Sequence, residues 1–170
     1  MQPDFNTLPD FYLGYVKSVK EKDVILALKH TKLDLMERFK SIPEQNGDFR
    51  YDRGKWSIKE VINHVIDAER VFAYRALSFA RNDKTELPGF DENAWAPEAW
   101  ADRRSLDQLI KEFKHTRKST IDLFESFTEE MLMAKGKANG VEFSVVNLGY
   151  IIAGHGLHHS NIISERYMSS

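Results

Sequence analysis

The chain contains no cysteine among its 170 residues. This absence excludes disulfide bonds, thiolate metal ligands and a protein thiol nucleophile, so any metal site must be built from histidine, aspartate or glutamate. If thiol chemistry takes place here, the sulfur has to arrive with a co-substrate. The chain also lacks an uninterrupted apolar stretch of roughly 18 residues, which is the length that a membrane-spanning helix requires.

The chain also has no large excess of positive or negative residues. The chain has 24 Lys and Arg residues against 26 Asp and Glu residues, which gives a formal net charge of −2. No basic run provides the electrostatic footprint of a nucleic-acid-binding protein. Residues 1–11 lack the basic-then-apolar order of a signal peptide. We therefore expect a cytoplasmic protein that binds neither nucleic acid nor a membrane.

Hydrophobic residues make up 42% of the chain, which is enough for the core of a sizeable domain. We expect one domain over residues 1–170, in which apolar residues recur at the three- and four-residue steps of helices. Residues 1–22 form a lead-in with a short helical piece near residues 10–19. Four long helices with polar outer faces then predict an all-α fold, a four-helix bundle.

Capping residues set the expected helix starts. Asp23 precedes the first long helix, which ends at residues 41–43. Ser57 and Glu60 have the spacing of a capping box, so the second helix begins there and runs to about residue 81. The third and fourth helices begin after Ser105 and Ser144, and the fourth is expected to continue to residue 167 as one amphipathic helix. Before it, residues 135–143 predict a tight turn or a small hairpin.

The connection between the second and third helices, residues 82–104, is long and rich in aromatic side chains. It contains Phe90, Trp95 and Trp100, and we expect it to lack regular structure. Loops of this length are usually functional or disordered. Two interpretations stay open: the aromatic side chains pin the loop over the core, or the loop covers a site as a lid.

Histidines occupy positions in the last helix where hydrocarbon is expected. At about 100° per residue, His155 and His159 fall within the apolar stripe and His158 falls at its edge. A buried imidazole without a partner costs on the order of 1–3 kcal/mol, so the first two need partners. A metal ion is one such partner, and a carboxylate or a water is a simpler one. The pattern lacks the His-Glu-x-x-His form, so no general base of the zincin type lies between the two.

A third metal ligand is expected from another helix, and His64 is the best candidate. It lies about 70° from the centre of the apolar stripe of the second helix, which places it at a groove between helices. The alternative is a boundary histidine that hydrogen-bonds to a neighbour. Asp67 and Glu60 lie one turn away on either side, and each either orients a ligand imidazole or solvates the helix. The capping box already explains Glu60.

Three further polar positions have open interpretations. Arg75 projects near the His64 face, where it either binds an anionic group of a substrate or pairs with a carboxylate; the second is commoner. His158 is a fourth ligand, a proton-transfer group or a polar residue at the edge of the stripe. His30 and His115 lie among polar residues, and we expect both to be exposed to solvent.

Three motifs in order resemble the DinB/YfiT-like superfamily: residues 54–70 (GKWSIKEVINHVIDAER), residues 87–92 (LPGFDE) and residues 151–159 (IIAGHGLHH), with Glu165-Arg166-Tyr167 after the last. The resemblance covers nearly the whole chain. It implies a four-helix bundle, often a homodimer, that holds one divalent ion, Zn or Ni or a similar metal, with three histidines. In this chain those positions are His64, His155 and His159. The family name comes from expression induced by DNA damage and implies no DNA binding.

The resemblance leaves three functions open. Some relatives are metal-dependent transferases that use a low-molecular-weight thiol such as bacillithiol or mycothiol, and one is a thiol-dependent isomerase. The first hypothesis is therefore a metal-dependent S-transferase that acts on a small electrophile. The second is a metal-dependent hydrolase that uses the same site. The third is a non-catalytic bundle that binds a small molecule or a partner, in which the metal is structural or absent. A structural site would be closed by a fourth ligand, Asp67 or His158.

Overall fold

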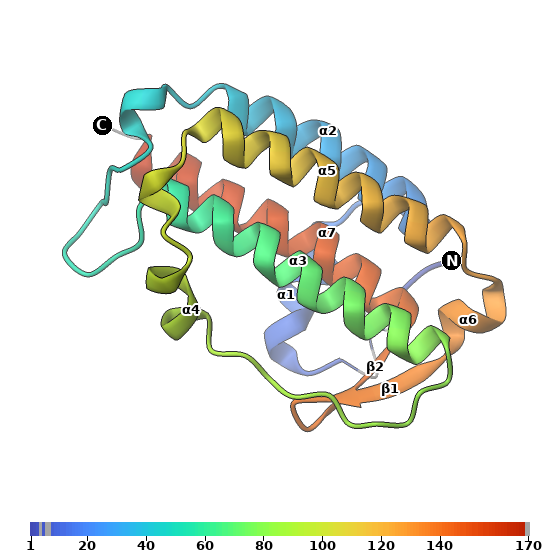
Figure 1. Cartoon of the computed structure of the whole chain (residues 1–170). Helices are drawn as coiled ribbons and strands as arrows, with labels where there is room; N and C mark the ends of the chain where they lie inside the picture. Colours follow the sequence, from blue (N-terminus) through green and yellow to red (C-terminus); the bar gives the residue numbers. More distant parts are fainter. Residues whose placement is uncertain (4, 6–7, 169–170) are drawn as a thin grey trace.

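Serine and aspartate caps define the four long helices, as the sequence predicts. The computed structural model describes residues 1–3, 5 and 8–168 (Figure 1). Asp23 accepts hydrogen bonds from two backbone N–H groups of the first long helix, and Ser57 forms the predicted capping box with Glu60. Ser105 and Ser144 cap the third and fourth. The predicted all-α four-helix bundle is confirmed, with α2 at Val24–Lys40, α3 at Ile58–Ala80, α5 at Leu106–Glu125 and α7 at Val145–Ile162.

The order of the helices around the bundle differs from their order along the chain. The main contacts join α2 to α7, α7 to α3, α3 to α5 and α5 back to α2. Helices α2 and α3 therefore lie diagonally opposite each other, and so do α5 and α7. Figure 1 shows that α2 and α7 run in one direction and that α3 and α5 run in the other. Helix α7 is thus antiparallel to its neighbour α3.

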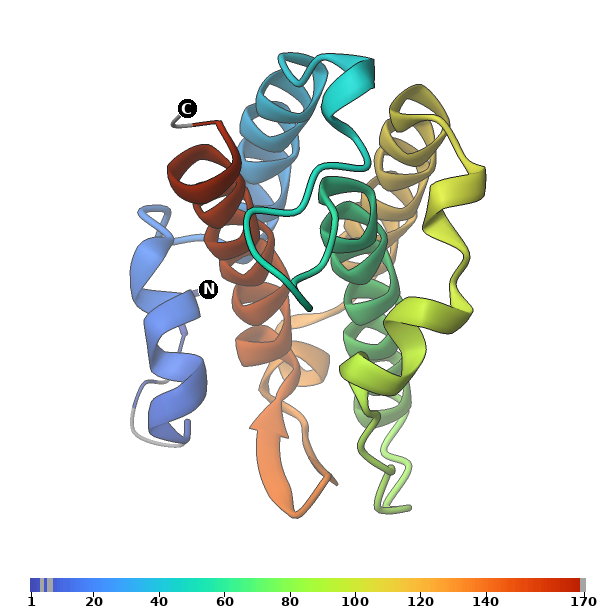
Figure 2. The ribbon, with the colours of Figure 1, turned by 90° about the vertical axis from the view of Figure 1, so that its left-hand side faces the viewer.

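A short helix, α1 (Asp10–Ser18), packs on the outer side of α7, beside the bundle (Figure 2). This contact is very close, because a Cβ atom added at Gly154 would lie 2.0 Å from the backbone oxygen of Tyr15. The predicted lead-in helix is confirmed. Since α1 covers the face that would otherwise meet solvent, every residue from Val145 to Gly156 is buried. The amphipathic pattern expected for the whole last helix is therefore wrong for this part, and residues 163–167 form a π-helical turn, η4.

The predicted small hairpin precedes α7. Strands β1 (Lys135–Ala138) and β2 (Val141–Ser144) pair antiparallel after the short helix α6 (Glu129–Met133). Asn139 and Gly140 connect the strands with φ angles of 51° and 75°. Two positive φ angles are what a two-residue hairpin turn of type I′ requires, and Asn-Gly is the preferred pair for it.

The connection 82–104 contains regular structure, so the expectation of an irregular loop is wrong. It holds α4 (Glu92–Glu98) and a 3₁₀ turn, η3 (Ala101–Arg103); a second such turn, η2 (Glu44–Asn46), lies between α2 and α3. Asp91 accepts hydrogen bonds from two backbone N–H groups and starts α4. Helix α4 turns Ala96 toward the protein, and the adjacent Trp95 is 46% exposed. Trp100, which follows α4, is 51% exposed. Backbone hydrogen bonds to the hairpin, at Leu87, hold this connection, and of its three aromatic side chains Phe90 packs against the core.

A buried ion pair lies in the middle of the bundle. Arg117 on α5 is fully buried, and its Nε and Nη2 atoms donate to the two carboxylate oxygens of Glu69 on α3 at 2.8 and 2.9 Å. The same guanidinium donates to the hydroxyl of Thr31 on α2 and to the carbonyl of Ile152 on α7. This one side chain therefore connects all four helices. None of the helices in the described part of the chain combines the length and the apolar character needed to cross a membrane.

Candidate metal centre

The antiparallel packing of α3 on α7 brings three histidines together. His64 lies in the second turn of α3, and His155 and His159 lie in the second half of α7, so the start of one helix meets the later part of the other. The Nε2 atom of His155 is 3.1 Å from the Nε2 atom of His64 and 3.1 Å from that of His159. The candidate ligand atoms of the three side chains lie within 4.8 Å of one another.

This geometry fits a divalent metal ion. Ligand nitrogens of a tetrahedral zinc site with bonds of 2.0–2.1 Å are about 3.3 Å apart. A single Nε2 atom of His155 that faces two other Nε2 atoms can donate only one proton, so hydrogen bonding alone does not explain why three like atoms meet. Three imidazoles are also a donor set that zinc and nickel accept. The three rings are therefore suitable ligands for one ion.

All three imidazoles are neutral at neutral pH, as metal ligands must be. Burial lowers the pKa of His64 to about 4, although the negative charge of Glu92 acts in the opposite direction. Burial, with smaller contributions from His64 and His158, lowers the pKa of His159 to about 3. Burial and the adjacent charges of His159 and His64 hold the pKa of His155 well below its usual range.

We expect metal-free protein to lose stability as the pH falls from about 6.5 to about 4. The unfolded chain takes up protons on these histidines below their ordinary pKa of about 6.5, whereas the folded chain keeps the rings neutral down to a lower pH. The unfolded state then binds more protons, so the free energy of unfolding rises with pH across this window. Urea unfolding midpoints at pH 7.5, 6 and 5 measure the effect. His159→Leu should reduce the slope, and a slope that it leaves unchanged would contradict this origin.

A cavity of about 570 Å³ opens beside the three rings. It is lined by α1, by the first three turns and the middle of α3, by the start of α4, by the hairpin turn and by α7. The ring of Trp56 lies 4.9 Å from that of His64, and the ring of Tyr15 lies 5.5 Å from that of His155. Aromatic side chains therefore surround the histidines on the cavity side.

Arg75 lines the same cavity and is 3% exposed. Its Nη2 atom donates to the carbonyl of Pro88 at 2.9 Å, and Tyr12 lies within hydrogen-bonding reach. Its guanidinium lies 5.5 Å from the centre of the Phe72 ring. Among the described residues, no carboxylate forms an ion pair with it. Of the two interpretations from the sequence, the pairing with a carboxylate finds no partner among these residues.

Asp67 does not face the histidines. Its carboxylate accepts a hydrogen bond from Asn63 at 2.7 Å and forms an ion pair with Arg70, on the side of α3 that faces α5. The suggestion that Asp67 orients a ligand imidazole or completes a metal shell therefore fits the structure poorly. The spacing from residue 64 to residue 67 is right, but a carboxylate three residues further along a helix is rotated by about 60° from the first side chain.

His158 lies beside the centre and outside it. The side chain is exposed, and its ring lies 5.1 Å from that of His159 and 5.2 Å from that of Tyr15. This matches the interpretation of a polar residue at the edge of the apolar stripe. His30 and His115 are exposed, as expected from their polar surroundings.

Four polar residues that line the cavity were not identified as site residues from the sequence: Tyr12, Tyr15, Glu92 and Asn139. Tyr12 and Tyr15 come from α1, and Glu92 lies at the start of α4. Each lies on a segment whose position depends on tertiary packing. Two local signals place them in the fold: the cap at Asp91 puts Glu92 at the start of a helix, and Asn139-Gly140 is a preferred hairpin-turn pair. Neither signal predicts that the side chain reaches the cavity.

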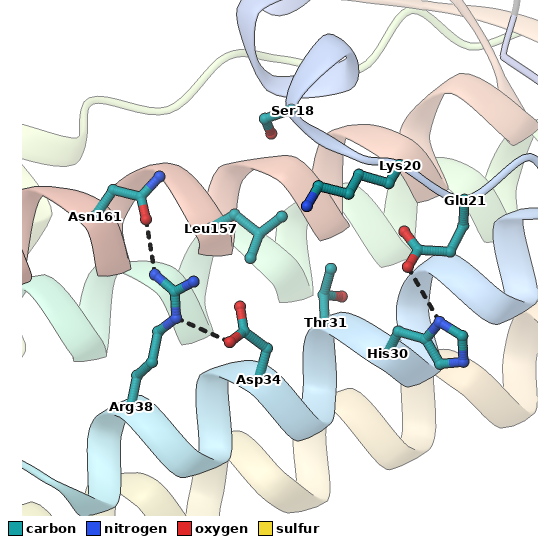
Figure 3. A pocket seen from close by; sticks show the side chains of 9 residues that line it. All are labelled: Ser18, Lys20, Glu21, His30, Thr31, Asp34, Arg38, Leu157 and Asn161. Atoms are coloured by element: carbon teal, nitrogen blue, oxygen red, sulfur yellow. Dashed lines mark hydrogen bonds and ion pairs between the residues drawn. The ribbon is translucent and has the colours of Figure 1, made fainter.

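A second cavity of about 420 Å³ lies between α2, α7 and the segment after α1 (Figure 3). Its polar side chains bond mainly to one another. Arg38 donates to Asp34 at 2.9 Å and to Asn161 at 2.7 Å, and the His30 ring lies 3.0 Å from the Glu21 carboxylate. These paired groups make the second cavity a weaker candidate than the three histidines.

The fold is shared with two solved structures. One is YfiT from Bacillus subtilis, described as "a probable metal-dependent hydrolase with an unusual four-helix bundle topology", with a TM-score of 0.71 and 17% identity over 84% of this chain and 82% of that one. The other is a mycothiol-dependent maleylpyruvate isomerase, with a TM-score of 0.69 and 12% identity over 95% of this chain and 62% of that one. At these identities the likeness concerns the fold alone.

Two curated relatives are more similar in sequence. A protein of Geobacillus thermodenitrificans with the name "Putative metal-dependent hydrolase" is 26% identical over 147 residues, which cover 82% of this chain and 79% of the relative. A protein of Oceanobacillus iheyensis with the same descriptive name is 27% identical over 128 residues, 74% of this chain and 72% of the relative. The family model of the DinB superfamily matches residues 27–163, which include all three histidines. The chain therefore belongs to the DinB superfamily.

Proposed function

We propose that this protein is a metal-dependent S-transferase, which joins a low-molecular-weight thiol of the bacillithiol type to a small electrophile. The observation that supports this most directly is the meeting of three imidazole nitrogens at the wall of a cavity of about 570 Å³. In this proposal His64, His155 and His159 hold one divalent ion, zinc or nickel. The ion supplies Lewis-acid activation that makes a thiol nucleophilic at neutral pH.

The number of ligands supports catalysis over a structural metal site. Within the described residues, the three histidines form the one cluster whose donor atoms are close enough to share an ion. Structural zinc sites are usually closed by four protein ligands, whereas catalytic sites use three and keep a position for water or substrate. Asp67 is bonded to Asn63 and Arg70, so it does not supply the fourth ligand. This argues against the non-catalytic bundle.

The side chains around the histidines supply the other requirements of the reaction. The rings of Trp56, Tyr15 and Phe72 lie within 6.2 Å of a histidine ring and give the cavity apolar walls there. Glu92 is the one carboxylate among the residues that line the cavity, and its charge reaches His64. In the proposed reaction its carboxylate takes up the proton of the thiol. The thiol sulfur forms a bond to the electrophilic carbon, and the leaving group departs with the electron pair of the bond that breaks.

Three observations support a thiol as the nucleophile in this proposal. The chain has no cysteine, so a sulfur nucleophile must enter from solution, and the cavity is large enough for a thiol and an electrophile together. Pockets of roughly 300–1,000 Å³ accommodate ligands of drug size. The maleylpyruvate isomerase with the same fold depends on mycothiol, according to its description.

Hydrolysis at the same site is the second candidate. It is favoured by the names of the two curated relatives, both described as metal-dependent hydrolases. In that reaction water replaces the thiol, and Glu92 takes up a proton of the water as a general base.

We expect turnover of 1-chloro-2,4-dinitrobenzene by metal-loaded protein to require added bacillithiol. The two candidate reactions give different coloured products, a thioether with the thiol and 2,4-dinitrophenol with water, so absorbance spectra separate them. Glu92→Gln should lower kcat by about 100-fold, the lower range for the loss of a general base. Asp91→Asn, which keeps the start of α4 and changes the charge next to Glu92, is the matched control. Formation of 2,4-dinitrophenol without thiol would replace the first candidate with the second.

A further inference from the structure

Two arginines are buried in the described part of the protein, and they differ in how their charge is compensated. Arg117 is fully buried and donates to both carboxylate oxygens of Glu69, to a hydroxyl and to backbone carbonyls. Arg75 is 3% exposed, and the acceptors near it are the Pro88 carbonyl and the Tyr12 hydroxyl, which are both neutral. The first arginine is a completed structural pair, whereas the second has no anionic partner in residues 1–3, 5 and 8–168.

A buried guanidinium without an anion is costly to the protein. Charged side chains are almost never fully buried unless they are paired, because removal from water penalises the charged form. Burial accordingly lowers the pKa of Arg75 from its ordinary value. Two neutral acceptors leave some of the five N–H donors of the guanidinium without an acceptor. Since Arg75 lines the cavity, these donors are available to a molecule inside it.

The position of Arg75 relative to the histidines defines the length of such a molecule. His64, Ala68, Phe72 and Arg75 all line the cavity, at steps of three or four residues along one side of α3. Residues 64 and 75 are separated by about 16 Å along the helix axis, at a rise of 1.5 Å per residue. Side chains on a helix lean toward its N-terminus, so Arg75 reaches back toward His64. A molecule whose anionic group binds Arg75 must therefore be several bonds long to reach the histidines.

The other walls of the cavity define the character of the molecule. Phe72 lies 5.5 Å from the Arg75 guanidinium and 6.2 Å from the His155 ring, and Tyr12 and Phe90 also line the cavity, so its walls are largely aromatic. Glu92 lines it as well, and its negative charge disfavours a dianion such as a phosphate monoester more than a singly charged group. The planar fork of a guanidinium matches the two oxygens of a carboxylate.

We propose that Arg75 binds the carboxylate of the substrate, an elongated monocarboxylic acid with an aromatic or apolar body whose reactive carbon lies at the three histidines. The position of the reactive carbon at the three histidines rests on the proposed metal-dependent function, because the histidines define where the reaction takes place. The carboxylate site itself depends only on Arg75 and the cavity, so a binding measurement tests it separately from turnover.

Isothermal titration of the metal-loaded protein with 3-phenylpropionate and with its neutral amide tests the site. We expect the acid to bind more tightly than the amide, and Arg75→Gln to weaken binding of the acid by about 10- to 100-fold, as for loss of a charge-assisted hydrogen bond. Binding of the amide should change little. Arg75→Lys should retain part of the preference, because it keeps the charge and loses the fork. Any contact of the acid with the metal is common to the wild type and the variants and cancels in this comparison.

Arg81→Gln is the matched control, because Arg81 follows the end of the same helix, is exposed and lies outside the cavity. It removes the same charge and should leave the preference for the acid intact.

Equal binding of acid and amide by the wild type, or a preference that survives in Arg75→Gln, would overturn the proposal. A larger loss for phenylphosphonate than for the carboxylate would overturn the choice of a carboxylate. If Arg75→Gln fails to fold, Arg75→Met, which also removes the charge, replaces it in the comparison. Acid binding that depends on Arg75 in a protein without thiol-transfer activity would uphold the site and reject the proposed function.

Discussion

His155→Ala protein should carry almost no divalent metal, whereas the wild type purified without an affinity tag should carry about one ion per chain. His155 is the central ligand of the proposed site, because its Nε2 atom lies 3.1 Å from the Nε2 atoms of both other histidines. Loss of a residue that hydrogen-bonds to a metal ligand typically lowers the affinity for the metal by about 10- to 100-fold. Loss of the ligand His155 itself should therefore lower it by more than about 100-fold. Elemental analysis after gel filtration measures the metal content, and circular dichroism checks that the helices remain.

His158→Ala is the matched control for this experiment. It removes an exposed imidazole from the same helix, one residue from His159, and should leave the metal content at about one per chain. His64→Gln provides a milder change on the other helix and should also lose the ion. A fully metal-loaded His155→Ala protein, or a folded wild type that never binds a divalent ion at neutral pH, would remove the proposed metal centre.

Arg117→Leu should lower the free energy of unfolding by about 3–5 kcal/mol. The substitution leaves the carboxylate of Glu69 buried among hydrocarbon without its partner, and that side chain is only 2% exposed. Domains of this size are stable by about 5–15 kcal/mol, so the variant should be close to unfolding at physiological temperature. Urea unfolding followed by circular dichroism gives the value.

Two comparisons identify the cause of this loss. Lys118→Gln on the same helix breaks an exposed ion pair with Asp122, and should cost less than about 1 kcal/mol. The double substitution Glu69→Leu/Arg117→Leu removes both charges and should recover much of the stability, because the penalty comes from the unpaired carboxylate. If Arg117→Leu costs no more than Lys118→Gln, the buried pair has little effect on stability.

Helix limits were predictable from the sequence because their causes are local. The capping box of Ser57 and Glu60 requires contacts only within the first turn, and the Asn139-Gly140 turn depends on two backbone angles. The pairing of His155 with His159 was predictable for the same reason, since side chains four residues apart on a helix are neighbours.

The approach of His64 to this pair depends on a long-range feature. Helices α3 and α7 are adjacent only because α2 and α3, which follow each other in the chain, lie diagonally across the bundle. Helix periodicity alone does not define that order. The grouping of His64 with His155 and His159 is implied by sequence motifs that resemble the DinB superfamily and does not follow from the packing of the helices.

The remaining parts of the cavity could not be predicted from local patterns. Arg75 was placed on the correct face of its helix, but the choice between a carboxylate and a substrate depended on which side chains other segments bring near it. The same is true of Glu92, which reaches the cavity because Leu87 forms backbone hydrogen bonds to the hairpin. The surroundings of Asp67 also depend on tertiary packing, because its partner Arg70 forms a second ion pair with Glu112 of α5.

The glycine at position 154 has a consequence for other members of the superfamily. Even one methyl group at this position would collide with the backbone at Tyr15. Only glycine therefore allows α1 to pack this closely against α7, the helix that carries His155 and His159. The family model begins at residue 27 and so does not include that preceding helix. Members with alanine or a larger residue at this position should therefore differ on this flank of the reaction chamber, and in which compounds they admit, even where all three histidines are retained.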